Sequence, residues 1–338
     1  MFGSRLFSDS EVQDLYFPRE EFGVLKVVVA LGGNALEGEG GDRGYDEQMR
    51  NVRTACTEIA ELIRLGHQPI ITHGNGPQVG DLLLQQESAK GEVPEKPLHL
   101  LGAMTQGEVG SMIQRTLINL LSDDTKTFPV ISVVTHTVVD ARDPAFASPS
   151  KPVGPFYDSD TARRMEKEKG VSMRRVRPGA GKAYRRVVAS PEPLRIVESG
   201  VIRKIVEAGI SLICSGGGGI PVVVNGKGEF KGVDAVIDKD LAAARLAEDV
   251  RAEGLLILTD VDAVKLDFGK PAEKDVKLMT VAQAKAWTAE GQFLPGSMLP
   301  KVEACTRFIE GGGKKAVIAK LGSAVEALNG GAGTAFTK

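Results

Sequence analysis

Short apolar runs alternate with amphipathic stretches along most of this chain. The runs are rich in β-branched residues, and each is followed by glycines or by a polar turn. They occupy residues 25–31, 69–72, 210–214, 255–258 and 316–319. Continuously apolar runs of this length predict strands that are buried on both faces of a sheet.

The stretches between these runs place apolar residues at three- and four-residue spacing, which predicts amphipathic helices. In the helix predicted over 46–65, the apolar positions are Met49, Val52, Cys56, Ile59 and Ile63. Gly66 is suited to end that helix, and Gly209 ends a second apolar stripe over 201–206. Buried strands alternating with such helices predict an α/β fold, a three-layer αβα sandwich around a mainly parallel sheet.

Glycine-bearing or polar turns follow four of the predicted strands. The turns are Gly32-Gly33-Asn34, Gly74-Asn75-Gly76, Gly216–Gly219 and Thr259-Asp260. In open parallel sheets, ligands bind in the crevice at the carboxyl ends of the strands. The repetition of such turns at strand ends therefore predicts a shared ligand crevice.

The chain length of 338 residues allows one large α/β domain or two average ones. We expect a single domain over 24–338, preceded by an N-terminal extension over 1–23. That extension contains too many acidic residues for a transit peptide. Residues 140–193 interrupt the alternation and are rich in proline, glycine and charge. A stretch this long predicts an inserted lid subdomain, at about 140–192, above the crevice.

Composition narrows the class of protein. The net charge is −2, and the basic cluster between Arg174 and Arg186 lacks interleaved aromatic residues, which favours an anion-facing or solvated loop over a nucleic-acid surface. Three widely spaced cysteines, Cys56, Cys214 and Cys305, predict reduced, buried thiols in a cytoplasmic protein. No apolar run approaches the roughly 18 residues that a membrane span requires.

Common nucleotide-binding fingerprints are absent: the chain has neither GxxxxGK[ST] nor a GxGxxG between a strand and a helix. The four histidines show no metal-ligand spacing, so no protein-held metal is predicted. What remains is glycines, isolated lysines such as Lys301, and the triplet Asp238-Lys239-Asp240. A charged helix start explains the triplet by itself, but its closeness to Gly216–Gly219 also suits a clamp for a phosphate group. Phosphoryl transfer requires mainly positioning and cations, which glycine amides and lysines supply.

Eight longer motifs make the sequence recognisable. They are VVALGGNA (28–35), HGNGPQVG (73–80), AMTQGEVG (103–110), KPVGPFY (151–157), GGGGIPVV (216–223), GVDAVIDKDLA (232–242), ILTDVD (257–262) and PGSMLPK (295–301). With these motifs in this order, the chain resembles the carbamate kinases of the amino-acid kinase family over essentially all of 25–338.

The resemblance implies a role for each matching position. Gly32, Gly33 and Asn34 would donate hydrogen bonds to the transferred phosphoryl group, and Gly74, Asn75 and Gly76 would hold the carbamoyl end. Lys239 and Lys301 would stabilise the phosphates with Asp240 orienting both, and Lys151 would reach the transferring group from the lid. The nucleotide site would be lined by Gly216, Gly217, Gly218, Gly219, Thr259, Asp260 and Asp262.

The same resemblance implies reversible phosphoryl transfer from carbamoyl phosphate to ADP, giving ATP and carbamate. Mg²⁺ would be held mainly by nucleotide phosphates, and the protein would be a homodimer in arginine or carbamoyl-phosphate catabolism. The expected partners are these small molecules, with neither nucleic acid nor membrane.

One segment departs from the family pattern. Where the family commonly shows EDAGRGWR, this chain has PGAGKAYR over 178–185. Drift in a tolerant lid explains the difference most simply. Two alternatives remain open: another acid kinase of the same family, or a catalytically weak nucleotide-binding regulatory protein.

Overall fold

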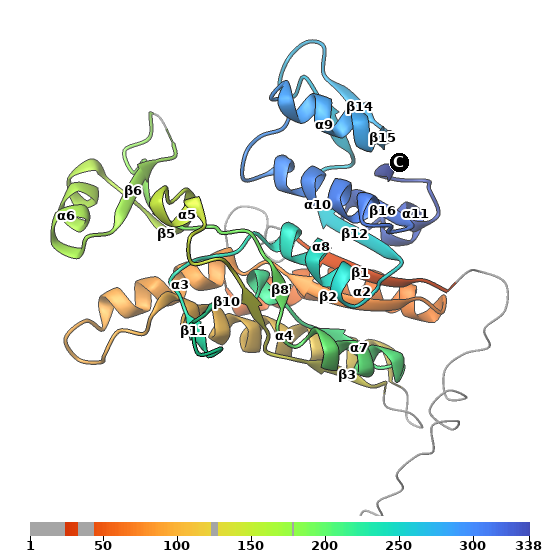
Figure 1. The fold of residues 1–338 in the computed structure, drawn as a ribbon, viewed down its shortest axis with the longest axis horizontal. Coiled ribbons are helices and arrows are strands. Elements are labelled where there is room, and N and C mark those ends of the chain that lie inside the picture. The colour runs from red at the N-terminus through yellow and green to blue at the C-terminus, as the bar shows by residue number, and fades with distance from the viewer. Residues whose placement is uncertain (1–23, 33–43, 123–127, 178) are drawn as a thin grey trace, which may run out of the picture.

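The computed structural model describes residues 24–32, 44–122, 128–177 and 179–338. Its centre is an eight-stranded sheet with the order β15-β17-β16-β12-β1-β2-β9-β3 (Figure 1). These strands are β15 (Leu278–Thr280), β17 (Thr334–Thr337), β16 (Lys315–Lys320), β12 (Gly254–Thr259), β1 (Lys26–Leu31), β2 (Gln68–His73), β9 (Ser211–Ile213) and β3 (Val130–Ser132). Neighbours pair in parallel except at β16–β17, where the pairing is antiparallel. The sheet is therefore mainly parallel, as predicted.

Helices cover both faces of this sheet. On one face, α2 (Tyr45–Arg64), α4 (Leu98–Leu121) and α11 (Ala324–Leu328) bury their apolar residues against alternate strand positions. On the other face lie α7 (Ser199–Glu207), α8 (Lys239–Asp249) and α10 (Met298–Glu310). In β1, Val27, Val29 and Leu31 point to the first face and Val28 and Ala30 to the second. This alternation confirms the αβα sandwich and explains why the strand is apolar throughout.

The remaining elements form smaller units. A four-stranded sheet has the order β11 (Phe230–Gly232), β10 (Ile220–Val224), β4 (His136–Val138) and β8 (Arg195–Ile196). A hairpin joins β13 (Val264–Leu266) and β14 (Lys274–Val276), and α9 (Val281–Ala289) follows β15. α5 (Pro144–Ala147) is a single turn, and α3 (Gly76–Ser88) follows β2.

Residues 151–177 and 179–188, here called the β5–β7 unit, project from one end of the molecule beside α3 (Figure 1). The unit contains β5 (Lys151–Tyr157), α6 (Ser159–Lys169), β6 (Ser172–Arg175) and β7 (Tyr184–Val188), with the strands in the antiparallel order β5-β7-β6. It lies within the stretch for which a lid was predicted. The lid bounds of 140–192 stay a prediction.

Within the part of the chain that the structure describes, no helix is long and apolar enough to cross a bilayer. The predicted extension over 1–23 lies outside the described residues.

Candidate active site

The carboxyl ends of β1, β2 and β12 meet at one edge of the sheet and line a cavity of about 250 Å³, here called the strand-end cavity. Gly32, after β1, donates its backbone N–H to Leu258 at 2.9 Å, and Gly74, after β2, donates to Leu31 at 3.0 Å. These two bonds extend the ladder one residue beyond each strand, so the glycines are fixed by the sheet. A cavity is therefore present at the strand ends, where a ligand crevice was expected.

Helix α3 begins at this cavity. Its N-cap residue, Asn75, makes no side-chain capping bond, because its Nδ2 instead donates to Thr105 Oγ1 of α4 at 2.8 Å. Gly76 opens the helix, lines the cavity and is followed by Pro77. A helix N-terminus carries partial positive charge and open backbone donors. This end of α3 is thus suited to receive an anionic group.

The four glycines 216–219 pack closely against other parts of the protein, and Gly217 also lines the cavity. A Cβ on Gly216 would lie 2.3 Å from His73 Nε2, and one on Gly217 would lie 2.1 Å from Asn75 Nδ2. Gly217 also has φ +64°, in the region that favours glycine. This packing gives the glycines a structural role, since a glycine cluster beside a strand allows close approach of another element as well as of a ligand.

Three lysines meet around two buried aspartates at the other wall of the cavity. Lys301 Nζ, from α10, donates to Asp240 Oδ2 at 2.8 Å, and Lys239 Nζ donates to Asp240 Oδ1. The Asp240 side chain is 3% exposed. Burial by itself raises the pKa of this carboxyl, but the charges of Lys239 and Lys301 outweigh it and hold the pKa at about 2. Asp240 is therefore ionised and fixes both ammonium groups.

The two lysines differ in their own titration. Burial lowers the pKa of Lys239, and the neighbouring Lys301 charge adds to that effect although Asp240 opposes it. Burial acts in the same direction on Lys301, but Asp240 outweighs it, so the pKa of Lys301 is raised. The ionised Asp240 carboxylate favours the charged form of both lysines, against the effect of burial.

Lys151 enters the cavity from the first residue of β5. Its Nζ donates to Asp238 Oδ2 at 2.8 Å, across 87 positions of sequence. The other oxygen of Asp238 caps α8 by accepting from the backbone N–H of Asp240 at 2.9 Å. One aspartate thus starts the helix that carries Lys239 and holds the lysine of the β5–β7 unit. From the sequence, Asp238 could be assigned to the charged start of a helix. Its pairing with Lys151 could not be predicted.

Most of the residues predicted for the site come together. Those lining the strand-end cavity are Gly32, Gly74, Asn75, Gly76, Lys151, Gly217, Lys239, Asp240, Thr259, Asp260 and Lys301. Gly216, Gly218 and Gly219 are buried and are not among its lining residues. Asp262 is 78% exposed and pairs with Lys320 at 3.3 Å. Gly33 and Asn34 lie outside the described residues.

The cavity also has lining residues that sequence reasoning did not single out, among them Gly296 and Ser297. Both stand in the PGSMLPK motif just before α10. Their place in that motif was the feature of the sequence from which they could have been predicted as site residues.

The carboxylates in the cavity are mostly engaged by lysines. Asp238 and Asp240 hold lysines, while Asp260 is exposed and accepts from Thr259 Oγ1 at 3.0 Å. Within the described ranges, no group of three or more His, Cys, Asp or Glu side chains is arranged to hold a metal ion. The cavity can therefore surround a polyanion with lysines and amides, but its carboxylates do not form a metal cage.

The sequence and structure of this chain match known kinases over most of their length. A profile described as the Amino acid kinase family matches residues 26–320. A carbamate kinase of Thermococcus kodakarensis is 51% identical over 91% of this chain and 98% of its own length. One from Pyrococcus horikoshii is 49% identical over 92% of this chain and 99% of its own. The structure of carbamate kinase from Giardia lamblia bound to AMP-PNP superposes with a TM-score of 0.86, at 41% identity, over 94% of this chain and 99% of that one.

Proposed function

Because the chain belongs to the amino acid kinase family, and within it to the carbamate kinases, we propose that it transfers a phosphoryl group between carbamoyl phosphate and ADP. In the forward direction an oxygen of the ADP β-phosphate attacks phosphorus, the bond between phosphorus and the carbamate oxygen breaks, and ATP and carbamate leave. The observation that carries the proposal is the convergence of Lys151, Lys239 and Lys301 on one cavity at the glycine-bearing strand ends.

The arrangement suits a transition state with charge spread over phosphoryl oxygens. Lys239 and Lys301, fixed by Asp240, would face the phosphates, while Lys151 would reach the transferring group from the opposite side. Cations fixed in advance by a buried carboxylate require little reorganisation when charge develops, which is the main source of electrostatic catalysis.

Backbone N–H donors at two strand ends would each bind a different part of the substrate. Gly32, with Gly33 and Asn34 beyond it, would donate to the transferred phosphoryl group. Gly74, Asn75 and Gly76 would hold the carbamoyl end at the N-terminus of α3. A carbamate kinase of Giardia lamblia binds the nucleotide analogue AMP-PNP. Here the nucleotide would lie near Thr259–Asp262, with Gly216–Gly219 behind it.

We further propose Mg²⁺ as the counterion of the nucleotide. Asp238 and Asp240 hold lysines, whereas Asp260, within the described part of the chain, makes no ion pair with lysine or arginine. Mg²⁺ keeps several waters and commonly takes one or two carboxylates together with substrate phosphates. The residues present fit an ion held mainly by phosphates, which would neutralise part of their charge.

A homodimer is part of the same proposal. Leu100 and Met104 are one helical turn apart on α4 and are 45% and 44% exposed. Their spacing places both on one face of the helix, which offers an apolar strip to a second copy. A cytoplasmic location, with ATP formation in arginine or carbamoyl-phosphate catabolism, completes the proposal. Three buried free cysteines, Cys56, Cys214 and Cys305, suit a reducing compartment.

The segment that departs from the family pattern does not line the strand-end cavity in its described part, 179–185. Arg185 Nε donates to the Gly154 carbonyl at 2.9 Å, and the Arg185 and Arg177 guanidinium groups both lie over the Phe156 ring. These contacts stay within the β5–β7 unit, which supports drift of the segment with unchanged chemistry.

The test is ATP formation from carbamoyl phosphate and ADP with Mg²⁺, coupled to hexokinase, using Lys239→Ala as the control. Turnover that depends on Lys239 supports the proposal. If the folded protein binds ADP without turning over carbamoyl phosphate, a screen of other acyl phosphates decides between another acid kinase and a nucleotide-binding regulator.

A further inference from the structure

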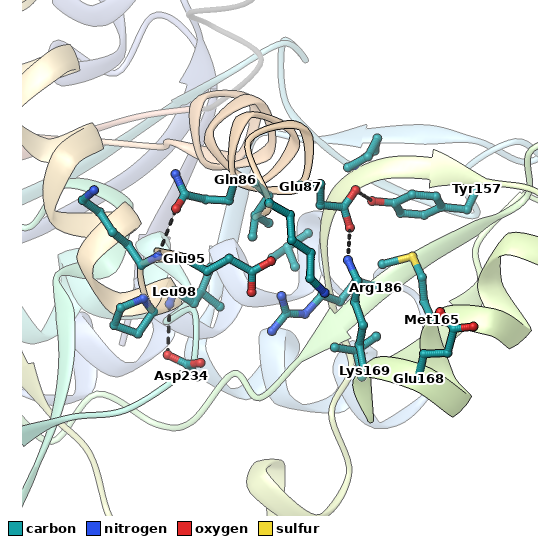
Figure 2. Close-up of a pocket in the computed structure, with 18 residues that line it drawn as sticks. Gln86, Glu87, Glu95, Leu98, Tyr157, Met165, Glu168, Lys169, Arg186 and Asp234 are labelled. Atoms are coloured by element: carbon teal, nitrogen blue, oxygen red, sulfur yellow. Dashed lines mark hydrogen bonds and ion pairs between the residues drawn. The ribbon is translucent and has the colours of Figure 1, made fainter. Parts of the chain in front are cut away.

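A second cavity, of about 520 Å³, lies between the β5–β7 unit and the body of the protein; it is here called the hinge cavity (Figure 2). On one side it is lined from α3 and the segment before α4, and on the other from β5, α6 and β7. Charged side chains of both signs surround it, among them Glu87, Glu168, Lys169 and Arg186. The β5–β7 unit is thus separated from the body by open space along part of its boundary.

Two elements connect this region to the strand-end cavity. β5 begins there at Lys151, and α3 begins there at Gly76. The two elements pack together midway, where a Cβ on Gly80 would lie 3.5 Å from the Gly154 Cα. A rotation of β5 about this contact would therefore move Lys151 relative to Asp238.

The far ends of the same two elements are joined by a single side chain. Glu87, near the end of α3, accepts from the Tyr157 hydroxyl at the end of β5 at 3.0 Å. Its other oxygen accepts from Lys169 Nζ, at the end of α6, at 2.9 Å (Figure 2). Burial, and next the Glu87 carboxylate, raise the pKa of Tyr157, so its hydroxyl remains a donor at neutral pH.

Apolar packing between the unit and the body is limited. Among the described residues, one small apolar cluster joins them, with four buried members, Val79, Leu98, Val153 and Val188, and with Leu83 and Val236 at its margin. Units joined by small interfaces move relative to one another by default. A polar contact that holds the far end of β5 therefore has a large effect on how the unit sits.

We propose that Glu87 is a positioning residue: it braces the β5–β7 unit against α3 through Tyr157 and Lys169 and so keeps Lys151 in the strand-end cavity. Glu87 does not line that cavity and acts through β5. The consequence for catalysis rests on the proposed function, whereas the consequence for the position of the unit does not.

The first experiment measures position without using activity. Spin labels at Lys167→Cys on α6 and Arg53→Cys on α2 report the distance between the unit and the body, because the three native cysteines are buried. In the Glu87→Ala variant, the population of molecules at displaced distances, relative to the population at the native distance, rises roughly three- to tenfold. This is the change expected for loss of a hydrogen-bonded contact. Tyr157→Phe, which removes a single hydroxyl, gives a smaller change in the same direction.

Glu168→Gln is the matched control. It removes the same charge from the wall of the same cavity while leaving the contacts of Glu87 in place. This variant keeps the native distance. If Glu87→Ala keeps it too, or if Glu168→Gln shifts it equally, Glu87 is not a brace and the proposal fails.

The second experiment asks whether Glu87 acts through Lys151. Glu87→Ala lowers kcat roughly three- to tenfold with little change in the KM for ADP, and Glu87→Gln, which retains one acceptor, recovers part of the loss. In a Lys151→Ala background, the same change has no further effect on kcat. Equal losses in both backgrounds would refute action through Lys151. Absence of kinase activity in the unmodified protein would refute the proposed function and leave the distance measurement to decide the brace.

Discussion

Lys301 Nζ lies 2.8 Å from Asp240 Oδ2, although the two residues are 61 positions apart and belong to different helices. The same carboxylate also accepts from Lys239. Two cations are thus fixed by one buried anion before any ligand binds. When either lysine is removed, Asp240 keeps its ion pair with the other one. The variants therefore report on catalysis more than on the stability of the fold.

We expect Lys239→Ala and Lys301→Ala each to lower turnover by roughly 10²–10³, the usual cost of removing one preorganised electrostatic contact. The measurement is steady-state ATP formation. Lys285→Ala is the control, because Lys285 makes an exposed pair with Glu310 away from the strand-end cavity. Near-normal turnover in one of the two variants would show that its lysine does not contribute to catalysis.

Asp238→Asn should tighten binding of phosphate-bearing ligands by several-fold, roughly the strength of one charge-assisted contact. The change releases Lys151 from its ion pair, while asparagine still caps α8. Calorimetric titration with ADP and with carbamoyl phosphate measures the effect.

The control for this variant is Asp143→Asn, which alters another helix-capping aspartate, at α5. Its affinities should equal those of the unmodified protein. Weaker binding in Asp238→Asn would mean that the carboxylate assists ligand binding and does not compete with it.

Gly217→Ala should destabilise the protein by about 1–3 kcal/mol, the usual cost of overpacking a buried site. Its Cβ would lie 2.1 Å from Asn75 Nδ2, and the backbone has φ +64°. Thermal unfolding of the variant and of Gly226→Ala, where a Cβ meets nothing within 4 Å, measures the difference. Equal melting temperatures would show that the Asn75 amide moves aside freely.

The buried His73 should make the protein less stable in acid. Burial lowers its pKa from 6.5 to about 4, while a hydrogen bond with the Gly74 carbonyl opposes this. Below pH 6.5 the unfolded chain binds a proton that the folded chain does not, so stability falls as the pH drops toward 4. This effect is absent above pH 6.5. The loss reaches up to about 3 kcal/mol.

Denaturant unfolding between pH 7 and pH 4 checks this expectation in the unmodified protein and in His73→Gln. The variant should lose less stability over that interval, because its side chain does not titrate. Identical pH dependence in the two proteins would show that His73 takes up its proton at the same pH in the folded and the unfolded chain.

The sheet could be predicted from the sequence because its strands are buried on both faces, and this makes each one a continuous apolar run. Strand β17 (Thr334–Thr337), which lies between the edge strand β15 and β16, carries no such run and was not predicted. Its antiparallel pairing with β16 depends on contacts made after the chain has folded back. Local pattern therefore identified the central strands of the sheet better than those toward its margin.

The candidate site was predictable where its chemistry follows a strand or opens a helix, as for Gly32 and Lys239. The pairing of Lys151 with Asp238 joins two segments 87 positions apart, and no local pattern carries that information. The four glycines 216–219 illustrate the reverse problem. Their position as a glycine cluster after a strand suggested a ligand, but much of their close approach is to other parts of the protein itself.

The ion pair between Lys151 and Asp238 also has a consequence for release. Any phosphate that binds Lys151 has to replace the Asp238 carboxylate, so each binding event exchanges one ion pair of Lys151 for another. The lysine returns to Asp238 when the ligand departs, which lowers the free-energy cost of departure. For an enzyme whose turnover requires products to leave, tighter ground-state binding alone gives no faster catalysis. Because Asp238 competes with the ligand for Lys151, the site binds its product less tightly than a site without that carboxylate would.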